Sequence, residues 1–118
     1  MGNVRIINRT KNTILADKAE MAETFLKRLR GLLGRDNLAA GEGLVIKPCN
    51  SIHTFFMRFS IDVAFLDKSG KVVAMAVFLP PLRLQGSWFR GHLVIELPAG
   101  TLARTNTALK DTIEIAET

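Results

Sequence analysis

Two hydrophobic runs separated by a tight polar turn constrain the fold of this chain more than any other feature. The first run, Ile61–Asp67, is followed by Lys68-Ser69-Gly70, and the second run returns as Lys71–Leu79. A short turn with glycine between two extended hydrophobic segments is typical of a β-hairpin. The sequence therefore predicts a pair of antiparallel strands in the middle of the chain.

Short apolar runs continue this pattern through most of the chain. They end at proline, glycine or polar turns, as the strands of a compact β fold do. The expected strands outside the central hairpin are Val4–Asn8, Thr13–Ala16, Leu44–Lys47, Ser51–Phe59, His92–Leu97 and Asp111–Ala116. We expect Leu82–Gly91 to be a loop, and Thr101–Ala108 to be a turn or a short helix.

One segment near the N-terminus has helical spacing instead. Its apolar residues recur three or four positions apart, at Met21, Phe25, Leu29 and Leu32. Asp17 has the position of a helix N-cap, and Glu20 three residues later suits a capping box. We therefore predict one substantial helix over Lys18–Leu33, with its apolar side against a sheet.

Taken together, these elements predict a mainly β fold, an antiparallel β-sandwich or partial barrel with one N-terminal helix packed on it. The length of 118 residues suffices for one domain, residues 1–118, and is too short for two ordinary domains. The hydrophobic content of 47% excludes a disordered chain.

The net charge of +5 is spread along the chain from Arg5 to Lys110. Dispersed charge of this size is typical of a solubilising surface, whereas nucleic-acid binding needs cations clustered on one face. Nucleic-acid binding is therefore the weaker alternative, and it would use the basic side of the predicted helix at Lys27, Arg28 and Arg30.

The single cysteine, Cys49, cannot form an internal disulfide, which favours a reducing compartment. The N-terminal residues lack the apolar core of a signal peptide, and no run reaches the roughly 18 apolar residues of a membrane span. We therefore expect a cytoplasmic location, with an exported and processed form as the alternative.

Reactive side chains gather in the stretch Pro48–Asp67. It contains the only cysteine, one of the two histidines at His53, and Asp62 between hydrophobic residues. A carboxylate in such surroundings needs a cation or hydrogen-bond donors, or else its pKa rises. This stretch is therefore where we expect a pocket.

Asp62 has two interpretations. Strand alternation would place Arg58 on the same face as Asp62, but a turn at Ser60 would break that alternation. We favour a structural role, in which the carboxylate accepts backbone N–H bonds and holds a turn. In the other interpretation Asp62 orients a ligand or transfers a proton.

Cys49 and His53 are four residues apart, but two ligands are too few for a zinc site. We therefore expect no metal and no cofactor. A cysteine–histidine nucleophile would need an orienting third group, for which Asp62 is the candidate. We favour Cys49 as a small buried hydrophobe. For His53, a ring bonded to the backbone and a ring in a pocket wall are about equally favoured.

Trp88, Arg90 and Glu96 complete the candidate site residues. Trp88 beside Arg90 in a glycine-flanked loop suits stacking on a ligand or a partner, although a tryptophan folded onto the sheet edge is favoured. Glu96, in a predicted strand, either pairs with an arginine or is a second acid near Asp62. Sequence alone does not decide between these.

The chain resembles the domain of unknown function 192 family, a prokaryotic group without an established activity. The matching segments are Thr24–Arg35, Gly43-Leu44, Ser51–Asp67, Ser69–Val73 and Glu96–Gly100. One departure is Ser60, where the family usually has proline. The resemblance implies a compact, mostly β domain with a helix packed on it, and it implies no reaction.

The leading hypothesis for function is a binding module. A pocket around His53 and Asp62, with Arg58, Cys49, Trp88, Arg90 and Glu96 as further candidate residues, would take a small polar or anionic ligand or a partner protein segment. The alternative is an enzyme, hydrolase-like or lyase-like, with Asp62 and His53 as its acid–base pair. The sequence leaves the ligand and the oligomeric state open.

Overall fold

The computed structural model describes residues 3–23, 36–47, 51–53, 58–81, 84–86 and 91–118, and the structural statements below concern these ranges. Within them the chain is mostly strand, with one short helix. The elements are β1 (Val4–Asn8), β2 (Thr13–Ala22), β3 (Glu42–Ile46), β4 (Ser51–His53), β5 (Ile61–Leu66), β6 (Val72–Leu79), β7 (Leu84–Gly86), β8 (Leu93–Pro98), α2 (Thr101–Arg104) and β9 (Ile113–Glu117).

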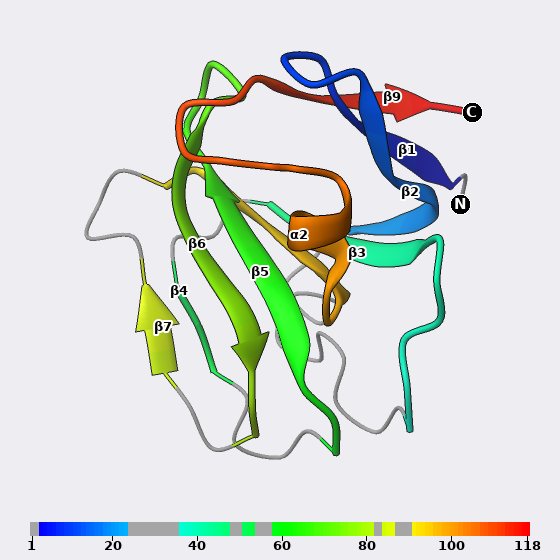
Figure 1. Ribbon diagram of the computed structural model, residues 1–118, viewed down its shortest axis with the longest axis vertical. Helices are drawn as coiled ribbons and strands as arrows, with labels where there is room; N and C mark the ends of the chain where they lie inside the picture. The colour runs from blue at the N-terminus through cyan, green and yellow to red at the C-terminus, as the bar shows by residue number, and fades with distance from the viewer. Residues whose placement is uncertain (1–2, 24–35, 48–50, 54–57, 82–83, 87–90) are drawn as a thin grey trace.

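Seven of these strands form one sheet that curls into a half-barrel (Figure 1). The strand order is β6-β5-β8-β3-β2-β1-β9. The two outermost strands approach each other at one end, where Lys71 bridges to Thr112 and the N–H of Ile113 donates to the carbonyl of Gly70 at 2.8 Å. The partial barrel expected from the sequence is therefore confirmed.

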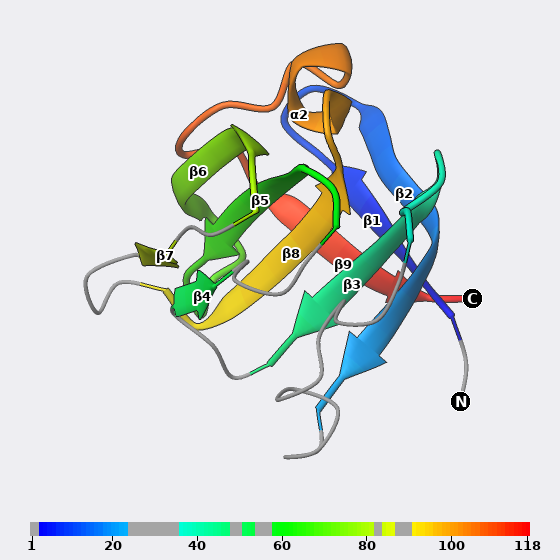
Figure 2. The same cartoon turned by 90° about the horizontal axis from the view of Figure 1, so that it is seen from below.

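The sheet is mixed rather than purely antiparallel. Strands β2 and β3 run parallel, with Ala19 beside Gly43 and Ala22 beside Ile46. The other neighbouring pairs are antiparallel. Helix α2 and the separate β4–β7 pair lie on opposite sides of the β5–β6 hairpin, as two perpendicular views show (Figures 1 and 2).

The central hairpin is formed as predicted. The Oδ1 atom of Asp67 accepts hydrogen bonds from the Ser69 hydroxyl and from the N–H groups of Ser69 and Lys71, at 2.7–3.0 Å. These bonds, with the Ser69 hydroxyl first, lower the pKa of Asp67. Gly70 has φ of 88°, which a side chain would strain. The turn is therefore fixed by its own residues.

The predicted helix is wrong over its first residues. Strand β2 runs through Ala22, and the N–H groups of Asp17 and Lys18 both donate to the carbonyl of Gly41. Asp17 is therefore not a helix cap. Pairing with β3 gives the backbone of this segment partners that a local helix would otherwise supply. The rest of the predicted helix, residues 24–35, lies outside the described residues.

Two further predictions need correction. The expected loop Leu82–Gly91 contains strand β7, which pairs with β4. The expected strand Ser51–Phe59 does not extend through its last residues, since Arg58 and Phe59 lie in a bend. The first hairpin, the short helix after Gly100 and the last edge strand are confirmed.

Buried side chains pack on both faces of the sheet. The inner core, inside the half-barrel, contains Ala64, Leu66, Ile95 and Leu97 among others. The outer core contains Ile61, Val63, Phe65, Leu44 and Val94 among others. Strand β5 is buried on both faces, which explains why its sequence is a continuous hydrophobic run.

Candidate functional site

Asp62 is fully buried, and three backbone N–H groups hold its carboxylate. Oδ1 accepts from Phe78 at 2.9 Å, and Oδ2 accepts from Gly100 at 3.1 Å and Leu102 at 2.9 Å. Phe78 and Gly100 have left-handed backbones, with φ of 49° and 95°. The carboxylate therefore ties β5 to the end of β6 and the start of α2. This geometry matches the structural role that the sequence favoured.

Arg58 does not reach Asp62. Its Nη1 atom lies 2.6 Å from Oδ1 of Asp36, and both of these side chains are exposed. An exposed ion pair of this kind contributes little to stability. The bend at residues 58 and 59 breaks the strand alternation that would have brought Arg58 to the face of Asp62.

Glu96 is buried on strand β8, and its cross-strand neighbours among the described residues are apolar. It is 3% exposed, and its Oε1 atom has no hydrogen-bond partner in the described ranges. The register places Leu44 on one side of it and Val63 on the other. Burial raises the pKa of Glu96 to about 7, because loss of water penalises the charged form. Such carboxyl groups concentrate at functional sites.

Asp62 and Glu96 lie on opposite faces of the sheet, so the hypothesis that they are paired acids is wrong. Asp62 is opposite Leu97, and Glu96 is opposite Val63, one position away. Because successive strand residues point to opposite faces, Asp62 faces the inner core and Glu96 the outer core. No single pocket on one face of the sheet can use both carboxyl groups.

The remaining sequence candidates are placed only in part. His53 ends strand β4, where its backbone pairs with Leu84. This strand is on the outer side of the β5–β6 hairpin, the side that Glu96 also faces (Figures 1 and 2). The His53 side chain, Cys49, Trp88 and Arg90 lie outside the part that the structure describes, and those predictions stay predictions.

A second feature, which the sequence did not suggest, is a cavity of about 360 Å³ at one end of the half-barrel. We call it the mouth cavity. Its apolar lining continues the inner core and consists of Val4, Met21, Leu66, Leu93, Ile113 and Ile115. These residues come from strands spread over the whole chain, so only the closed sheet brings them together.

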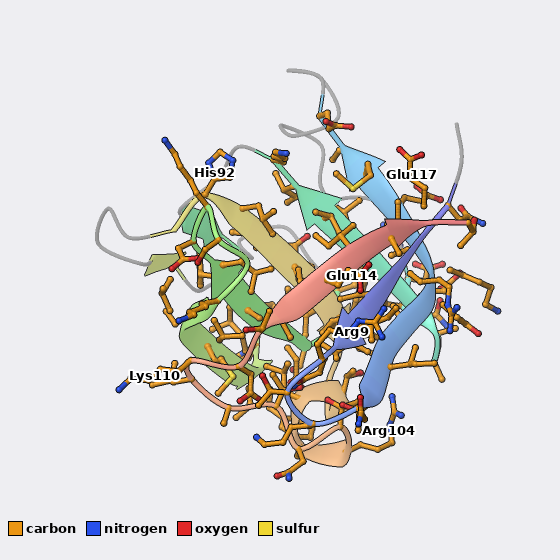
Figure 3. The ribbon with its side chains drawn as sticks, turned by 90° about the horizontal axis from the view of Figure 1, so that it is seen from above. Arg9, His92, Arg104, Lys110, Glu114 and Glu117 are labelled. Carbon is orange, nitrogen blue, oxygen red and sulfur yellow. The ribbon has the colours of Figure 1, made fainter. Side chains whose placement is uncertain are left out.

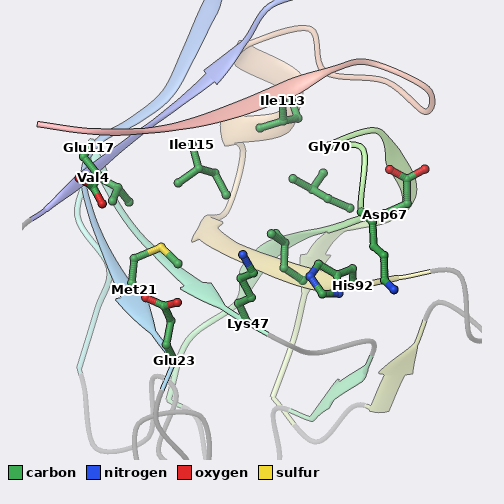
Figure 4. Close-up of a pocket in the computed structure, with 13 residues that line it drawn as sticks. Val4, Met21, Glu23, Lys47, Asp67, Gly70, His92, Ile113, Ile115 and Glu117 are labelled. Atoms are coloured by element: carbon green, nitrogen blue, oxygen red, sulfur yellow. The ribbon is translucent and has the colours of Figure 1, made fainter.

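Charged side chains and a histidine surround this apolar lining (Figure 4). They are Glu23, Lys47, Asp67, Lys68, His92 and Glu117. His92 and Glu117 lie at the same end of the molecule, and Arg104 and Lys110 lie at the other end (Figure 3). Most of these residues lie at or just beyond the ends of strands. This position is the one feature of the sequence from which the cavity could have been predicted.

The described residues contain no group of three or more histidine, cysteine, aspartate or glutamate side chains that could hold a metal ion. Within the same ranges, no helix is long and apolar enough to cross a membrane.

Known proteins are similar to this chain in sequence or in fold. A UPF0127 protein of Thermococcus sibiricus is 34% identical over 113 residues, which cover 92% of this chain and 73% of that protein. A UPF0127 protein of Pyrococcus abyssi is 36% identical, with 92% and 95% covered. These archaeal relatives extend over nearly all of the present chain.

A crystal structure of a protein of unknown function from Novosphingobium aromaticivorans has a TM-score of 0.81. It is 20% identical and covers 94% of this chain and 82% of its own, so it shows the fold alone. The model of the family described as Uncharacterized ACR, DUF192, matches residues 6–115. The resemblance found in the sequence is confirmed, and the chain belongs to the DUF192 family.

Proposed function

We propose that the domain binds a small polar ligand on the outer face of its sheet, with the Glu96 carboxyl as the polar anchor. The observation that carries the proposal is the buried Oε1 atom without a partner among the described residues. An unpaired buried polar atom costs about 1–3 kcal/mol. A ligand that supplies the missing hydrogen bond recovers this free energy on binding.

The flanking strands contribute little polarity to this part of the outer face. In the row across the sheet, Glu96 lies between Leu44 and Val63, and Glu20 follows beyond Leu44. Lys18 and Glu42 lie opposite each other in the next row of that face. The Glu42 carboxylate already accepts the N–H of Ala39 at 2.8 Å. On β5, β8 and β3, the charged side chains that lie on this face are therefore Glu96 and Glu42, and Lys18 and Glu20 follow on β2.

The protonation of Glu96 sets the class of ligand. With a pKa of about 7, the carboxyl is close to half protonated at neutral pH. The protonated form donates its O–H to a carbonyl, hydroxyl or carboxylate oxygen of the ligand. Because this form is lost at higher pH, the ligand affinity falls as the pH rises above about 7.

The enzyme alternative with Asp62 as acid or base has little support. Its carboxylate is buried and is bonded to three backbone N–H groups. If the ligand is a substrate, Glu96 is the better acid, because a pKa near neutrality suits proton transfer.

A thermal-shift screen tests the proposal. Sugars, nucleosides, small amides, small anions and divalent metals are added to the wild type at about pH 6 and about pH 8, on either side of the Glu96 pKa. We expect an oxygen-bearing compound to raise the melting temperature more at the lower pH. Glu96→Leu abolishes this shift. Glu96→Gln keeps a donor, so the shift stays but loses its pH dependence.

Glu20→Gln is the matched control, since it makes the same change on an exposed side chain of the same row. It leaves the shift unchanged. A shift that survives Glu96→Leu contradicts the assignment of the site. A metal that binds more tightly at the higher pH also contradicts it, because it indicates an ionised carboxylate holding a cation.

A further inference from the structure

We propose that the mouth cavity is a second binding site, for a short aliphatic carboxylate such as hexanoate. The aliphatic tail fills the cavity, and the carboxylate lies beside His92 and Lys68 at its edge. The site is separate from the proposed Glu96 site, because the lining of the cavity continues the inner core and Glu96 faces the outer core. The two proposals therefore concern opposite faces of one sheet.

The apolar part of the cavity is suited to an aliphatic tail. Leu66, Leu93 and Ile113 are buried members of the inner core that line the cavity. Met21 and Ile115 pack against the same core but stay partly exposed. A volume of about 360 Å³ lies at the low end of small-ligand pockets, which are roughly 300–1,000 Å³. A short aliphatic chain therefore fits this space, and its apolar surface leaves water on binding.

Two nitrogen-bearing side chains, of Lys68 and His92, line the cavity beside the β5–β6 turn. The N–H of His92 donates to the carbonyl of Leu66 at 2.7 Å, which holds the residue before β8 against the end of β5. Lys68 follows closely after Leu66, in the turn itself. Two segments that are distant in sequence therefore bring an ammonium group and an imidazole ring to one part of the cavity edge.

Both side chains are available to a ligand. Among the described residues, neither the Lys68 ammonium nor the His92 ring has a hydrogen-bond or ion-pair partner. The ammonium is a donor, and the imidazole ring carries an N–H in either tautomer, so both can donate hydrogen bonds to a carboxylate. Hydrogen bonds between charged partners are the stronger ones, which favours an anionic head group.

The Asp67 carboxylate also lies at this edge, but it serves its own turn. Its Oδ1 atom accepts three hydrogen bonds from Ser69 and Lys71, and the Lys71 ammonium partly offsets its charge. Two lysines, Lys68 and Lys71, therefore stand against one carboxylate. This edge of the cavity has an excess of positive charge even when the His92 ring is neutral.

The other charged residues of the lining are not assigned to the ligand. The β2–β3 register places Glu23 beside Lys47, and both residues have interactions within the protein, so their opposite charges compensate each other. Glu117 is exposed on β9, and Figure 4 shows it on the side of the cavity away from His92. Its negative charge therefore favours a ligand whose carboxylate points toward His92 and Lys68.

Calorimetric titration with compounds of matched chain length tests the site. Hexanoate has the carboxylate, hexanol replaces it by a hydroxyl, and hexylamine reverses its charge. We expect hexanoate to bind on the order of tenfold more tightly than either of the others. The shorter acid butyrate should bind roughly tenfold more weakly than hexanoate, because each buried methylene contributes up to about fourfold.

Variants of the two nitrogen-bearing side chains test the head group. Lys68→Gln and His92→Gln each weaken hexanoate, by roughly threefold to tenfold, and leave hexanol unchanged. Lys110→Gln is the matched control for Lys68→Gln, because it removes the same charge from an exposed lysine at the other end of the molecule (Figure 3). It leaves all of these affinities unchanged. Glu96→Leu also leaves hexanoate binding unchanged, which separates this site from the proposed Glu96 site.

Several results would overturn the proposal. The aliphatic tail is wrong if the affinity does not rise from butyrate to hexanoate, and the anionic head group is wrong if hexylamine binds as tightly as hexanoate. The mouth-cavity site is wrong if hexanoate does not bind, or if its binding is insensitive to both Lys68→Gln and His92→Gln. It is also wrong if Lys110→Gln weakens hexanoate as much as Lys68→Gln does. If Glu96→Leu abolishes hexanoate binding, the acid occupies the outer face instead, and the mouth-cavity site fails while the Glu96 proposal stands.

Discussion

Asp62 and Glu96 are both buried carboxyl residues on adjacent strands, and they differ in almost everything else. Asp62 faces the inner core with three backbone donors, whereas Glu96 faces the outer core with an oxygen that the described residues leave unpaired. Burial alone therefore does not identify a functional acid. The number of hydrogen bonds that each carboxyl receives separates a structural anchor from a candidate binding group.

Removing the anchor should have the largest effect. Asp62→Ala leaves three backbone N–H groups without their acceptor at a buried junction of β5, β6 and α2. We expect the free energy of unfolding in urea to fall by about 3–5 kcal/mol. Asp36→Ala, at an exposed ion pair, should change it by no more than about 0.5 kcal/mol. A loss below about 1 kcal/mol for Asp62→Ala would remove the anchor role.

Glu96 should instead make stability depend on pH. Its pKa is about 7 in the folded protein and 4.5 ordinarily, so the folded state holds the extra proton between these values. The free energy of unfolding therefore falls as the pH rises from about 4.5 through about 7, by roughly 3 kcal/mol in total. Urea denaturation of the wild type and of Glu96→Gln at several pH values in this range measures the effect as the difference between their free energies of unfolding. A difference that does not change with pH would contradict the prediction.

Replacing Glu96 by an apolar residue should sharpen the contrast with Asp62. Glu96→Leu removes an unpaired polar atom from between Leu44 and Val63. We expect a gain of about 1–2 kcal/mol at neutral pH, together with loss of the proposed ligand. A thermal melt with and without the ligand gives both quantities. A destabilised Glu96→Leu variant would show that the carboxyl supports the fold as Asp62 does.

Replacing Asp67 should have the smallest effect on the free energy of unfolding. Comparison with Asp62 shows how much of the cost of losing a hydrogen-bonded carboxylate is due to burial. The Asp67 carboxylate also accepts three hydrogen bonds, but in an exposed turn. Water replaces those bonds, so Asp67→Ala should cost about 1 kcal/mol in the same urea experiment. Because the pKa of Asp67 is lowered, its contribution is present at neutral pH and disappears as the pH falls through the folded value. An effect equal to that of Asp62→Ala would show that burial is not the deciding factor.

Sequence patterns predicted the fold well where an element depends on residues that are close together in the chain. The Asp67 hairpin, the first hairpin and the turn after Gly100 depend on neighbouring residues, and all three are present. The segment from Asp17 to Ala22 had a helical pattern that was overridden by pairing with β3, which begins twenty positions after Ala22. A pairing between distant segments is not encoded in the local spacing of either.

The sequence predicted some of the residues of the candidate site, but it did not predict how they are arranged in space. Asp62 and Glu96 were both named as candidate residues, but the faces on which they lie depend on the register between β5 and β8. A shift of one residue in that register would have put them on the same side. The mouth cavity was missed because its lining residues come from strands that are far apart in the sequence, and only the folded sheet brings them to one end.

The pairing of β1 with β9 has a consequence for the order of folding. Val4 is opposite Glu117, so this contact closes a loop of nearly the whole chain. During synthesis the β1–β2 hairpin can form early, but β1 then carries an open edge until β9 arrives. Contacts between such distant segments slow folding. A nascent chain therefore exposes the unpaired edge of β1, which is prone to aggregation, until β9 has been made.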